Sequence, residues 1–207
     1  MELWEMELKL ESAFMTPWHA DVIFGHLAWA YAEQYGDKKL SNWLFHFKTG
    51  HPPFVVSDGF IKNSFPRPFL PPPEKRATTK KEIIQQIKRG KKIKNHRYIY
   101  EDEFKDFLSG KEIAFSKEVQ GTLESEVNIF NIIDRESGSS LESDGIYELE
   151  SYHLKATDRI SVFVRVKDWA ALEEVKHLLR IVSLTGFGKK KGVGFGQFQV
   201  MDVIRRD

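Results

Sequence analysis

Cysteine is absent from this 207-residue sequence, which excludes disulfide bonds and thiolate metal sites. The N-terminus lacks the pattern of a signal peptide, and no apolar run approaches the ~18 residues that a membrane-spanning helix needs. We therefore expect a cytoplasmic protein with no membrane partner. A hydrophobic content of 41% and an aromatic content of 13% are sufficient for a buried core.

Net charge is nearly absent as well, with a formal value of +1 at pH 7. The charge is nevertheless uneven, because ten Lys or Arg residues between Lys75 and Arg97 accompany a single acid, Glu82. Attraction of a polyanion depends on the local field, so a small net charge does not argue against a nucleic-acid partner. A solvated helix face is the alternative interpretation of this segment.

Patterns of catalytic and metal-binding residues are also missing. No Ser-His-Asp, His-x-x-x-His or paired-carboxylate arrangement stands out in the sequence. Asp21 and Asp58 resemble metal ligands, but isolated aspartates near turns usually cap or stabilise the turn. We therefore expect no catalytic residue, no metal site and no cofactor.

Glycine and lysine, by contrast, are concentrated between Thr185 and Val200. Glycine costs a helix or strand roughly 0.5–1 kcal/mol relative to alanine, so a high density indicates a backbone that takes positive φ or lies close against another group. Free backbone N–H groups together with lysines favour a phosphate ligand, whereas a helix C-cap followed by a flexible connection is the alternative. The residues concerned are Gly186, Gly188, Gly192, Gly194 and Gly196, with Lys189, Lys190 and Lys191.

This glycine-rich loop is neither a Walker loop nor a dinucleotide fingerprint. Neither glycine spacing occurs in it. It follows a predicted helix, Asp168 to Leu184, with Asp168 as the candidate N-cap and an apolar face that begins at Trp169. It precedes a predicted strand, Gln197 to Ile204, whereas nucleotide-binding loops run from strand to helix. The sequence thus predicts an anion-binding loop of another kind.

Apolar periodicity predicts the regular elements of the chain. Residues Glu2 to Glu11 alternate apolar and charged side chains, which is typical of a half-buried strand with a solvent-exposed charged face. Thr16-Pro17 marks the start of a helix that runs to about Gln34, with threonine as the cap. The other expected elements are a helix over Lys38–Phe47 and strands over Phe54–Ser57 and Ile160–Val166.

The predicted order is strand, helix, strand, strand, helix, strand. This α+β order is the ferredoxin-like (RRM-like) βαββαβ arrangement. We expect a single domain over 1–207, with a large hairpin or loop insertion at about 60–154 and the glycine-rich loop before the last strand. Inside the insertion, Thr79 and Glu82 fit the capping box of a short helix that ends at Gly90.

The rest of the insertion predicts a hairpin. Its arms are Ile113 to Arg135 and Gly145 to Leu154, and they flank a polar tip, Glu136 to Asp144. Such a tip is typical of the end of a hairpin or of a disordered loop.

Four motifs carry a resemblance to a known family. In this combination and order the sequence resembles the RAMP proteins of CRISPR systems, and more narrowly the crRNA 5′-handle-binding subunit of type III-A (Csm) effector complexes. The glycine loop alone is typical of RAMP proteins in general, and the second motif narrows the resemblance. The motifs are Thr16-Pro-Trp-His-Ala-Asp21, Pro52-Pro-Phe-Val-Val-Ser-Asp58, Asn131-Ile-Ile-Asp-Arg-Glu-Ser-Gly138 and Gly186-Phe-Gly-Lys-Lys-Lys-Gly-Val-Gly-Phe-Gly196.

The resemblance implies a non-catalytic subunit of an antiviral complex that binds the crRNA 5′ handle. Its other partners would be a large polymerase-like subunit and a backbone RAMP subunit, which it joins. RNA would lie against the glycine-rich loop, including Phe187 and Phe195, and we add His19 and Arg135 to the RNA-binding candidates. Members of the family usually continue into a second ferredoxin-like half, whereas this sequence ends at Asp207, so we expect that half to be missing or supplied by another chain.

Two further functions remain open. Some RAMP proteins are metal-independent endoribonucleases that process CRISPR precursor RNA with histidine or tyrosine as acid and base. His19 is the candidate here because it lies at a helix start, although no second base lies at a readable spacing. A general single-strand binder would instead stack bases on Phe187 and Phe195 beside the lysines.

Overall fold

The computed structural model describes residues 1–69, 79–111, 113, 115, 119, 123–133, 135, 136, 138, 139, 145–155 and 157–206. Most of the predicted polar tip therefore lies outside the described residues. The chain is an α+β protein with antiparallel sheets. It forms two compact units, one made of Met1–Gly59 with Thr122–Asp207 and the other of Phe60–Gly121.

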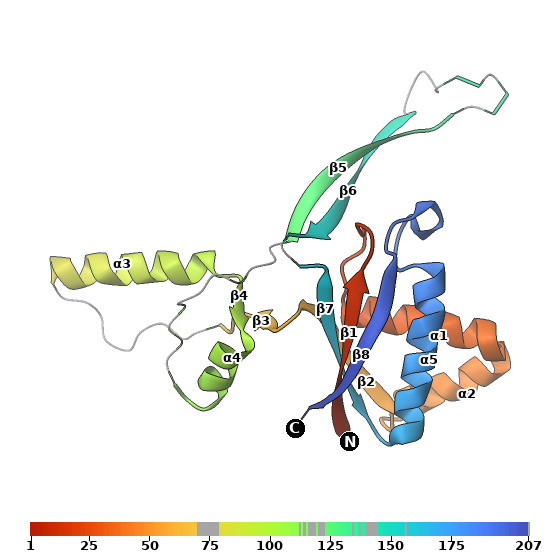
Figure 1. The fold of residues 1–207 in the computed structure, drawn as a ribbon, viewed down its shortest axis with the longest axis horizontal. Coiled ribbons are helices and arrows are strands. Elements are labelled where there is room, and N and C mark those ends of the chain that lie inside the picture. Colours follow the sequence, from red (N-terminus) through yellow and green to blue (C-terminus); the bar gives the residue numbers. More distant parts are fainter. Residues whose placement is uncertain are drawn as a thin grey trace. The chain divides into compact units, whose positions relative to one another are not determined.

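The larger unit is built on a four-stranded sheet in the order β2-β7-β1-β8 (Figure 1). Strand β1 pairs antiparallel with both β7 and β8, so that Met6 lies opposite Val162 and Val203. The period-two pattern predicted β1 and β7 correctly, because their alternate residues face a common core. The strands are β1 (Glu2–Leu10), β2 (Phe54–Ile61), β7 (Arg159–Val166) and β8 (Phe198–Arg206).

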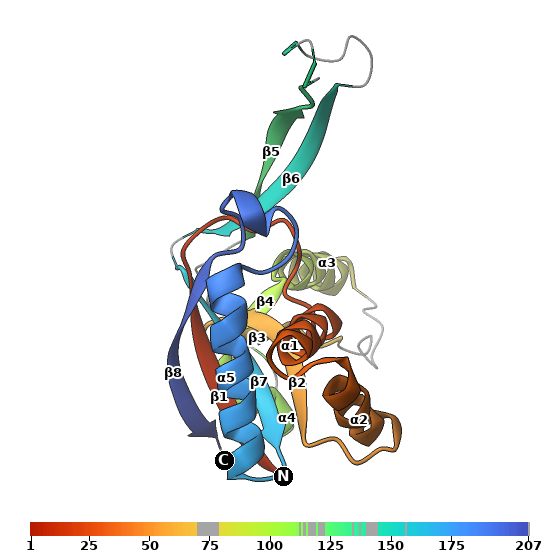
Figure 2. The ribbon, with the colours of Figure 1, turned by 90° about the vertical axis from the view of Figure 1, so that its right-hand side faces the viewer.

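Three helices belong to the same unit: α1 (Ala20–Tyr35), α2 (Asp37–Lys48) and α5 (Trp169–Thr185). Figure 2 shows α1 and α5 on one face of the sheet, where Leu27 and Leu172 are fully buried. The cap predicted for α5 is confirmed, because the Asp168 carboxylate accepts the Ala171 N–H at 2.9 Å. Trp169 is an exception to the predicted apolar face, since it is 62% exposed.

The start of α1 differs from the prediction. Thr16 and Pro17 precede the helix, which begins at Ala20. Asp58 of β2 stabilises this start by accepting the Ala20 N–H at 2.6 Å, a role consistent with an isolated aspartate near a turn. Because the two residues are 38 positions apart, local sequence carries no signal for this contact.

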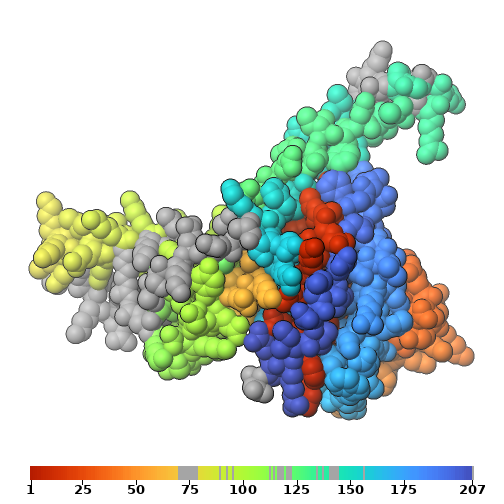
Figure 3. All heavy atoms as spheres, in the orientation of Figure 1, coloured from red at the N-terminus to blue at the C-terminus, as the bar shows by residue number. Residues whose placement is uncertain are grey.

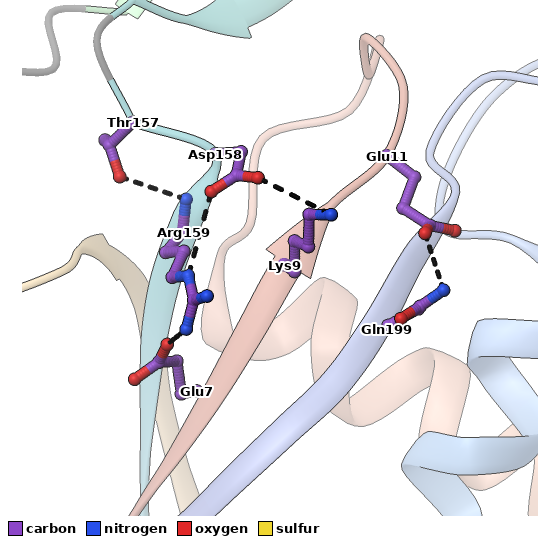
Figure 4. Close-up of polar contacts among 7 residues, drawn as sticks. All are labelled: Glu7, Lys9, Glu11, Thr157, Asp158, Arg159 and Gln199. Atoms are coloured by element: carbon purple, nitrogen blue, oxygen red, sulfur yellow. Dashed lines mark hydrogen bonds and ion pairs between the residues drawn. The ribbon is translucent and has the colours of Figure 1, made fainter.

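The charged face of β1 is buried, contrary to the expectation of a solvent-exposed face. Glu5 is 2% exposed and Glu7 is 1% exposed. Arg206 of β8 binds Glu5, with 2.6 Å between Nε and Oε2, and Arg159 of β7 binds Glu7 as Figure 4 shows. A carboxylate withdrawn from water is tolerated when it is paired, so arginines from the two neighbouring strands explain the burial.

A two-stranded hairpin, β5 (Leu123–Asn131) with β6 (Ile146–Leu154), completes the larger unit. The second predicted arm is confirmed, whereas the first was predicted to begin at Ile113 and begins at Leu123, because Ile113 and Phe115 belong to the core of the smaller unit. The base of the hairpin is tied to the segment before α1. The N–H of Phe14 donates to the Tyr152 carbonyl at 2.9 Å, and the N–H of Tyr152 donates to the Phe14 carbonyl at 2.7 Å. The hairpin is therefore held close to the loop end of the sheet.

The smaller unit has its own core of Ile99, Ile113 and Phe115. The capping box of Thr79 and Glu82 is confirmed, but the helix that follows continues past the predicted end at Gly90. The sequence did not predict the two short paired strands, because three residues show no period. The elements are β3 (Ser64–Pro66), α3 (Lys80–Asn95), β4 (Tyr98–Tyr100) and α4 (Glu101–Leu108). Among the described residues, no helix is long and apolar enough to cross a membrane.

Candidate functional site

The glycine-rich loop connects α5 to β8, in the helix-to-strand order that the sequence predicts. It begins at Gly186, the C-cap of α5, which has a φ of 83°. Residues Lys189 to Gly194, which include a short 3-10 turn, η1 (Lys191–Val193), form the exposed crown of the loop. Figure 3 shows the surface of this part of the chain, in blue, beside the hairpin in green.

Phe187 fixes the loop to the core. Its ring stacks on Trp18 at a centroid distance of 3.8 Å and an angle of 6°, and it lies 4.7 Å from the ring of His26. Only 1% of Phe187 is exposed. In this arrangement Phe187 supports the loop from below, and stacking on a base would require it to leave the core.

Hydrogen bonds from the loop backbone add three further attachments. The N–H of Gly188 donates to Nε2 of His26 at 3.0 Å, and the N–H of Lys189 donates to Oγ1 of Thr16 at 3.0 Å. The N–H of Gly196 donates to the Ala13 carbonyl at 2.8 Å. Many of the amides expected to bind an anion are thus occupied by the protein itself.

The glycines fall into two groups by what surrounds them. A Cβ at Gly188 would lie 2.5 Å from Thr16, and one at Gly196 would lie 1.9 Å from the Phe187 carbonyl oxygen, so folding itself requires glycine at both positions. Gly192 does not have a positive φ, and a Cβ added to it would meet no described atom within 4 Å beyond its chain neighbours. A close approach by another molecule would explain why glycine occupies this position.

The lysine triplet is also divided. Lys189 and Lys191 are exposed, whereas Lys190 is half-buried and takes a left-handed conformation with a φ of 60°. The Lys190 ammonium donates to the Tyr147 hydroxyl at 2.8 Å and lies 4.9 Å from the centre of the Phe130 ring. Lys190 therefore connects the loop to the hairpin, and two lysines remain for an anion.

Three aromatic rings gather around Lys190. Phe130 of β5 and Tyr147 of β6 are opposite each other in the hairpin register, and their rings stack at 5.6 Å with an angle of 17°. Phe195 of the loop lies 6.5 Å from Phe130. Together they form an aromatic cluster beside the crown, and flat rings of this kind can receive unpaired bases.

The other predicted residues, His19 and Arg135, lie outside these contacts. His19 is the N-cap residue of α1, but its side chain does not cap the helix and is 62% exposed. Its Nδ1 lies 3.7 Å from Oδ2 of Asp58. Arg135 is exposed in the turn after β5.

Sequence reasoning missed four residues that shape the site. The sequence predicts Thr16 as a helix cap, and His26 lies inside the predicted helix with no pattern that marks it. Phe130 and Tyr147 belong to the predicted hairpin arms, but nothing in the sequence places them beside Lys190, because 43 residues separate Tyr147 from it.

The electrostatics of the loop favour a neutral His26. Burial of the ring, reinforced by the charge of Lys191, lowers the pKa of His26 below its ordinary value of 6.5. A neutral ring can accept the Gly188 N–H at Nε2, whereas a protonated ring cannot. Among the described residues, no group of three or more His, Asp or Glu side chains is placed to hold a metal ion.

These features describe a class of protein: an α+β protein whose glycine-rich loop is attached next to a β-hairpin. No protein-family model and no curated protein matches the sequence. Solved structures do match. A crystal structure of a Csm1-Csm4 cassette in complex with cA4 shares 14% identity and a TM-score of 0.60, over 98% of this chain and 71% of that chain.

Two further structures agree with it. A Csm3-Csm4 subcomplex of the type III-A CRISPR-Cas interference complex gives 15% identity and a TM-score of 0.59, over 100% of this chain and 70% of that chain. A type III-B Cmr-beta complex bound to cognate target RNA gives 10% identity and a TM-score of 0.51, over 99% of this chain and 61% of that chain. The neighbours are RAMP subunits of type III effectors, Csm4 among them, so the resemblance in the motifs is confirmed at the level of the fold.

The His26 contact predicts a pH-dependent loop. Because the pKa of His26 is lowered, its hydrogen bond is fully present above pH 6.5 and is lost as the pH falls through the folded-state pKa. One hydrogen bond contributes about 1 kcal/mol, so exchange of the Gly188 amide should speed up roughly fivefold after correction for intrinsic exchange. Amide exchange measured by NMR between pH 7.5 and 5 tests this.

His26→Gln is the control, since its amide oxygen can accept the same N–H without titrating. The variant should show no step in Gly188 protection over that range. The same step in the variant and in the original chain would contradict a role for His26.

Proposed function

We propose that this chain is the RNA-binding subunit of a type III CRISPR effector complex and binds the 5′ handle of crRNA. The proposal rests on the crown of the loop, where Lys189 and Lys191 are exposed beside Gly192. The fold shared with subunits of type III effectors supports it.

The fold itself is part of the proposal. We infer a ferredoxin-like βαββαβ unit made of the four-stranded sheet with α1 and α5. The strand order β2-β7-β1-β8 supports this, because one helix follows the first strand and the other follows the third strand of the sheet. In this view the segment between β2 and β7 is an insertion in a single domain.

Phosphate recognition is assigned to the crown. Two exposed ammonium groups supply charge, and the N–H groups of Lys190, Lys191 and Gly192 have no acceptor among the described residues. The missing side chain at Gly192 lets a sugar-phosphate chain approach these amides closely. Such contacts give affinity without reading sequence.

Base recognition is assigned to the aromatic cluster. Phe130 and Tyr147 offer a stacked pair on the hairpin, and Lys190 holds that pair against the loop. Sequence-selective recognition of RNA usually involves unstacked bases held by aromatic rings and polar groups. A handle of defined sequence fits such a cluster better than an arbitrary single strand.

The proposed protein partners follow from the same neighbours. Similarity to chains in a Csm1-Csm4 cassette and a Csm3-Csm4 subcomplex supports one contact with a large polymerase-like subunit and one with a backbone RAMP subunit. In this proposal the chain anchors the large subunit to the backbone.

Because Lys190 contacts the hairpin and Lys189 and Lys191 are exposed, we expect the three lysines to affect the salt dependence of RNA binding differently. Lys189→Ala with Lys191→Ala should reduce the log–log salt slope by roughly 1.4, since each lost single-strand phosphate contact removes roughly 0.7. Lys190→Ala should leave the slope almost unchanged and weaken affinity by freeing the hairpin. Fluorescence anisotropy over a salt series measures both.

The double variant Lys38→Ala with Lys48→Ala is a matched control, because it removes two exposed lysines from α2. It should leave the slope unchanged. Equal slopes for all variants would remove the loop from the RNA interface.

Gly192 gives the most direct test of handle binding. Gly192→Val should preserve the melting temperature, because a Cβ there meets no described residue, and should abolish any preference for crRNA with its own handle over crRNA with a scrambled handle. Gly196→Val should instead unfold the loop and lower the melting temperature, because its Cβ would overlap the Phe187 carbonyl. A competition assay and a thermal melt give the two readouts. Equal affinity of the original chain for both RNAs would reduce the proposal to a general single-strand binder.

We also propose that this chain does not cleave RNA. The rival function, processing of CRISPR precursor RNA, gains one observation, since Asp58 lies close enough to orient the exposed His19 ring. A general acid and base pair still lacks its second member there. Incubation of repeat RNA with the protein should therefore give no cleavage with or without Mg²⁺, whereas cleavage that His19→Ala abolishes would establish the rival.

A further inference from the structure

Helix α3 packs against the described core of the smaller unit through its last turn. Ile93, in its last turn, packs against the core of the smaller unit formed by Ile99, Ile113 and Phe115. Figure 1 shows the preceding turns reaching away from β4 and α4. The capping box of Thr79 and Glu82 closes the N-terminal end, so the helix is defined before any partner is present.

The exposed turns carry an apolar stripe. Ile83, Ile84 and Ile87 are 44%, 44% and 53% exposed, although isoleucine is among the residues most often buried. Their spacing places them on one side of the helix. Lys80, three residues before Ile83, and Lys91, four residues after Ile87, extend the same side, so a cation lies at each end of the stripe.

Helix α3 carries mostly positive charge. Seven Lys or Arg residues accompany one Glu between Lys80 and Asn95, a formal charge of +6. The single acid, Glu82, already accepts the Thr79 N–H in the capping box. A surface that covers α3 must therefore be acidic around its edge and apolar in its centre.

Two other occupants fit less well. RNA phosphates would satisfy the lysines, but they offer no apolar surface to the isoleucines. A membrane-surface helix presents a wide apolar face, often with Trp, Phe or Leu, whereas α3 has a stripe of three isoleucines and none of those residues in its sequence. An amphipathic helix with a short apolar stripe is typical of docking into a groove of a protein.

We propose that α3 docks, through Ile83, Ile84 and Ile87, into an acid-rimmed apolar groove on another protein subunit of the complex. This inference rests on the proposed function for the existence of that complex. It adds a contact separate from the glycine-rich loop, and the contact is made by the smaller unit.

Hydrogen exchange read by mass spectrometry on the full chain tests the proposal in four states: free, with crRNA alone, with vesicles of phosphatidylglycerol and phosphatidylcholine, and assembled with the large and backbone subunits. Peptides covering Lys80 to Lys91 should exchange at least about tenfold more slowly in the assembled complex. They should be unchanged by crRNA alone or by vesicles alone.

Two triple variants separate the stripe from the rest of the helix. Ile83→Ser, Ile84→Ser and Ile87→Ser together should remove the protection and weaken binding of the partner subunit roughly 100-fold or more, with RNA affinity unchanged. Lys81→Ser, Gln85→Ser and Lys88→Ser place the same number of serines on another side of α3 and should keep the protection.

Each contrary outcome has its own meaning. Assembly without protection of α3 would overturn this inference and leave the proposed function standing. Protection by crRNA alone would make α3 an RNA contact, and protection by vesicles would make it a membrane contact. Either result would overturn the proposal that α3 docks into a groove of a protein subunit. Failure of the original chain to assemble at all would overturn the proposed function and the inference with it.

Discussion

The stack of Phe187 on Trp18 is the contact on which the glycine-rich loop depends. With the rings 3.8 Å apart and nearly parallel, the first turn of the loop is part of the core rather than a surface connection. The Gly188 amide then reaches His26, and Gly196 must lie against the Phe187 backbone. Only the crown remains exposed, and its position relative to the sheet is set by this buried pair.

The loop therefore contains two groups of residues that differ in their surroundings. Gly188 and Gly196 satisfy close contacts inside the protein, whereas Gly192 satisfies none that the described chain makes. The Lys190 ammonium contacts Tyr147 and Phe130 of the hairpin, while Lys189 and Lys191 are exposed to solvent. A loop whose buried part is fixed to the core and whose crown is exposed is suited to bind the backbone of a ligand at a fixed position.

Charge is separated along the chain in a way that the net value of +1 conceals. Glu5 and Glu7 are buried against arginines of the neighbouring strands, so this face of the sheet presents paired charges in place of free cations. Exposed lysines of the crown and of α3 form two basic regions in the described part of the chain. The two basic regions belong to different units, and only α3 adds an apolar stripe, which is why the two regions are assigned different partners.

Sequence by itself determined the elements whose signals are local. The alternation of β1 and β7, the Asp168 cap, the capping box of Thr79 and the glycine density all depend on residues within one element or one loop. The resemblance in the motifs also anticipated the fold, because those motifs mark the loop and the helix start. Local patterns failed where a structure was too short to show a period, as in β3 and β4.

Tertiary structure alone decided which groups the candidate site residues contact. These contacts join residues far apart in the chain: Asp58 to the start of α1 over 38 positions, Gly188 to His26 over 162, and Lys189 to Thr16 over 173. Glycine at position 192 and glycine at position 196 look alike in the sequence, and only the atoms packed around them distinguish a requirement of the fold from a position with open space around it. Side-chain contacts of this kind are set by the packing of whole elements, which no local pattern records.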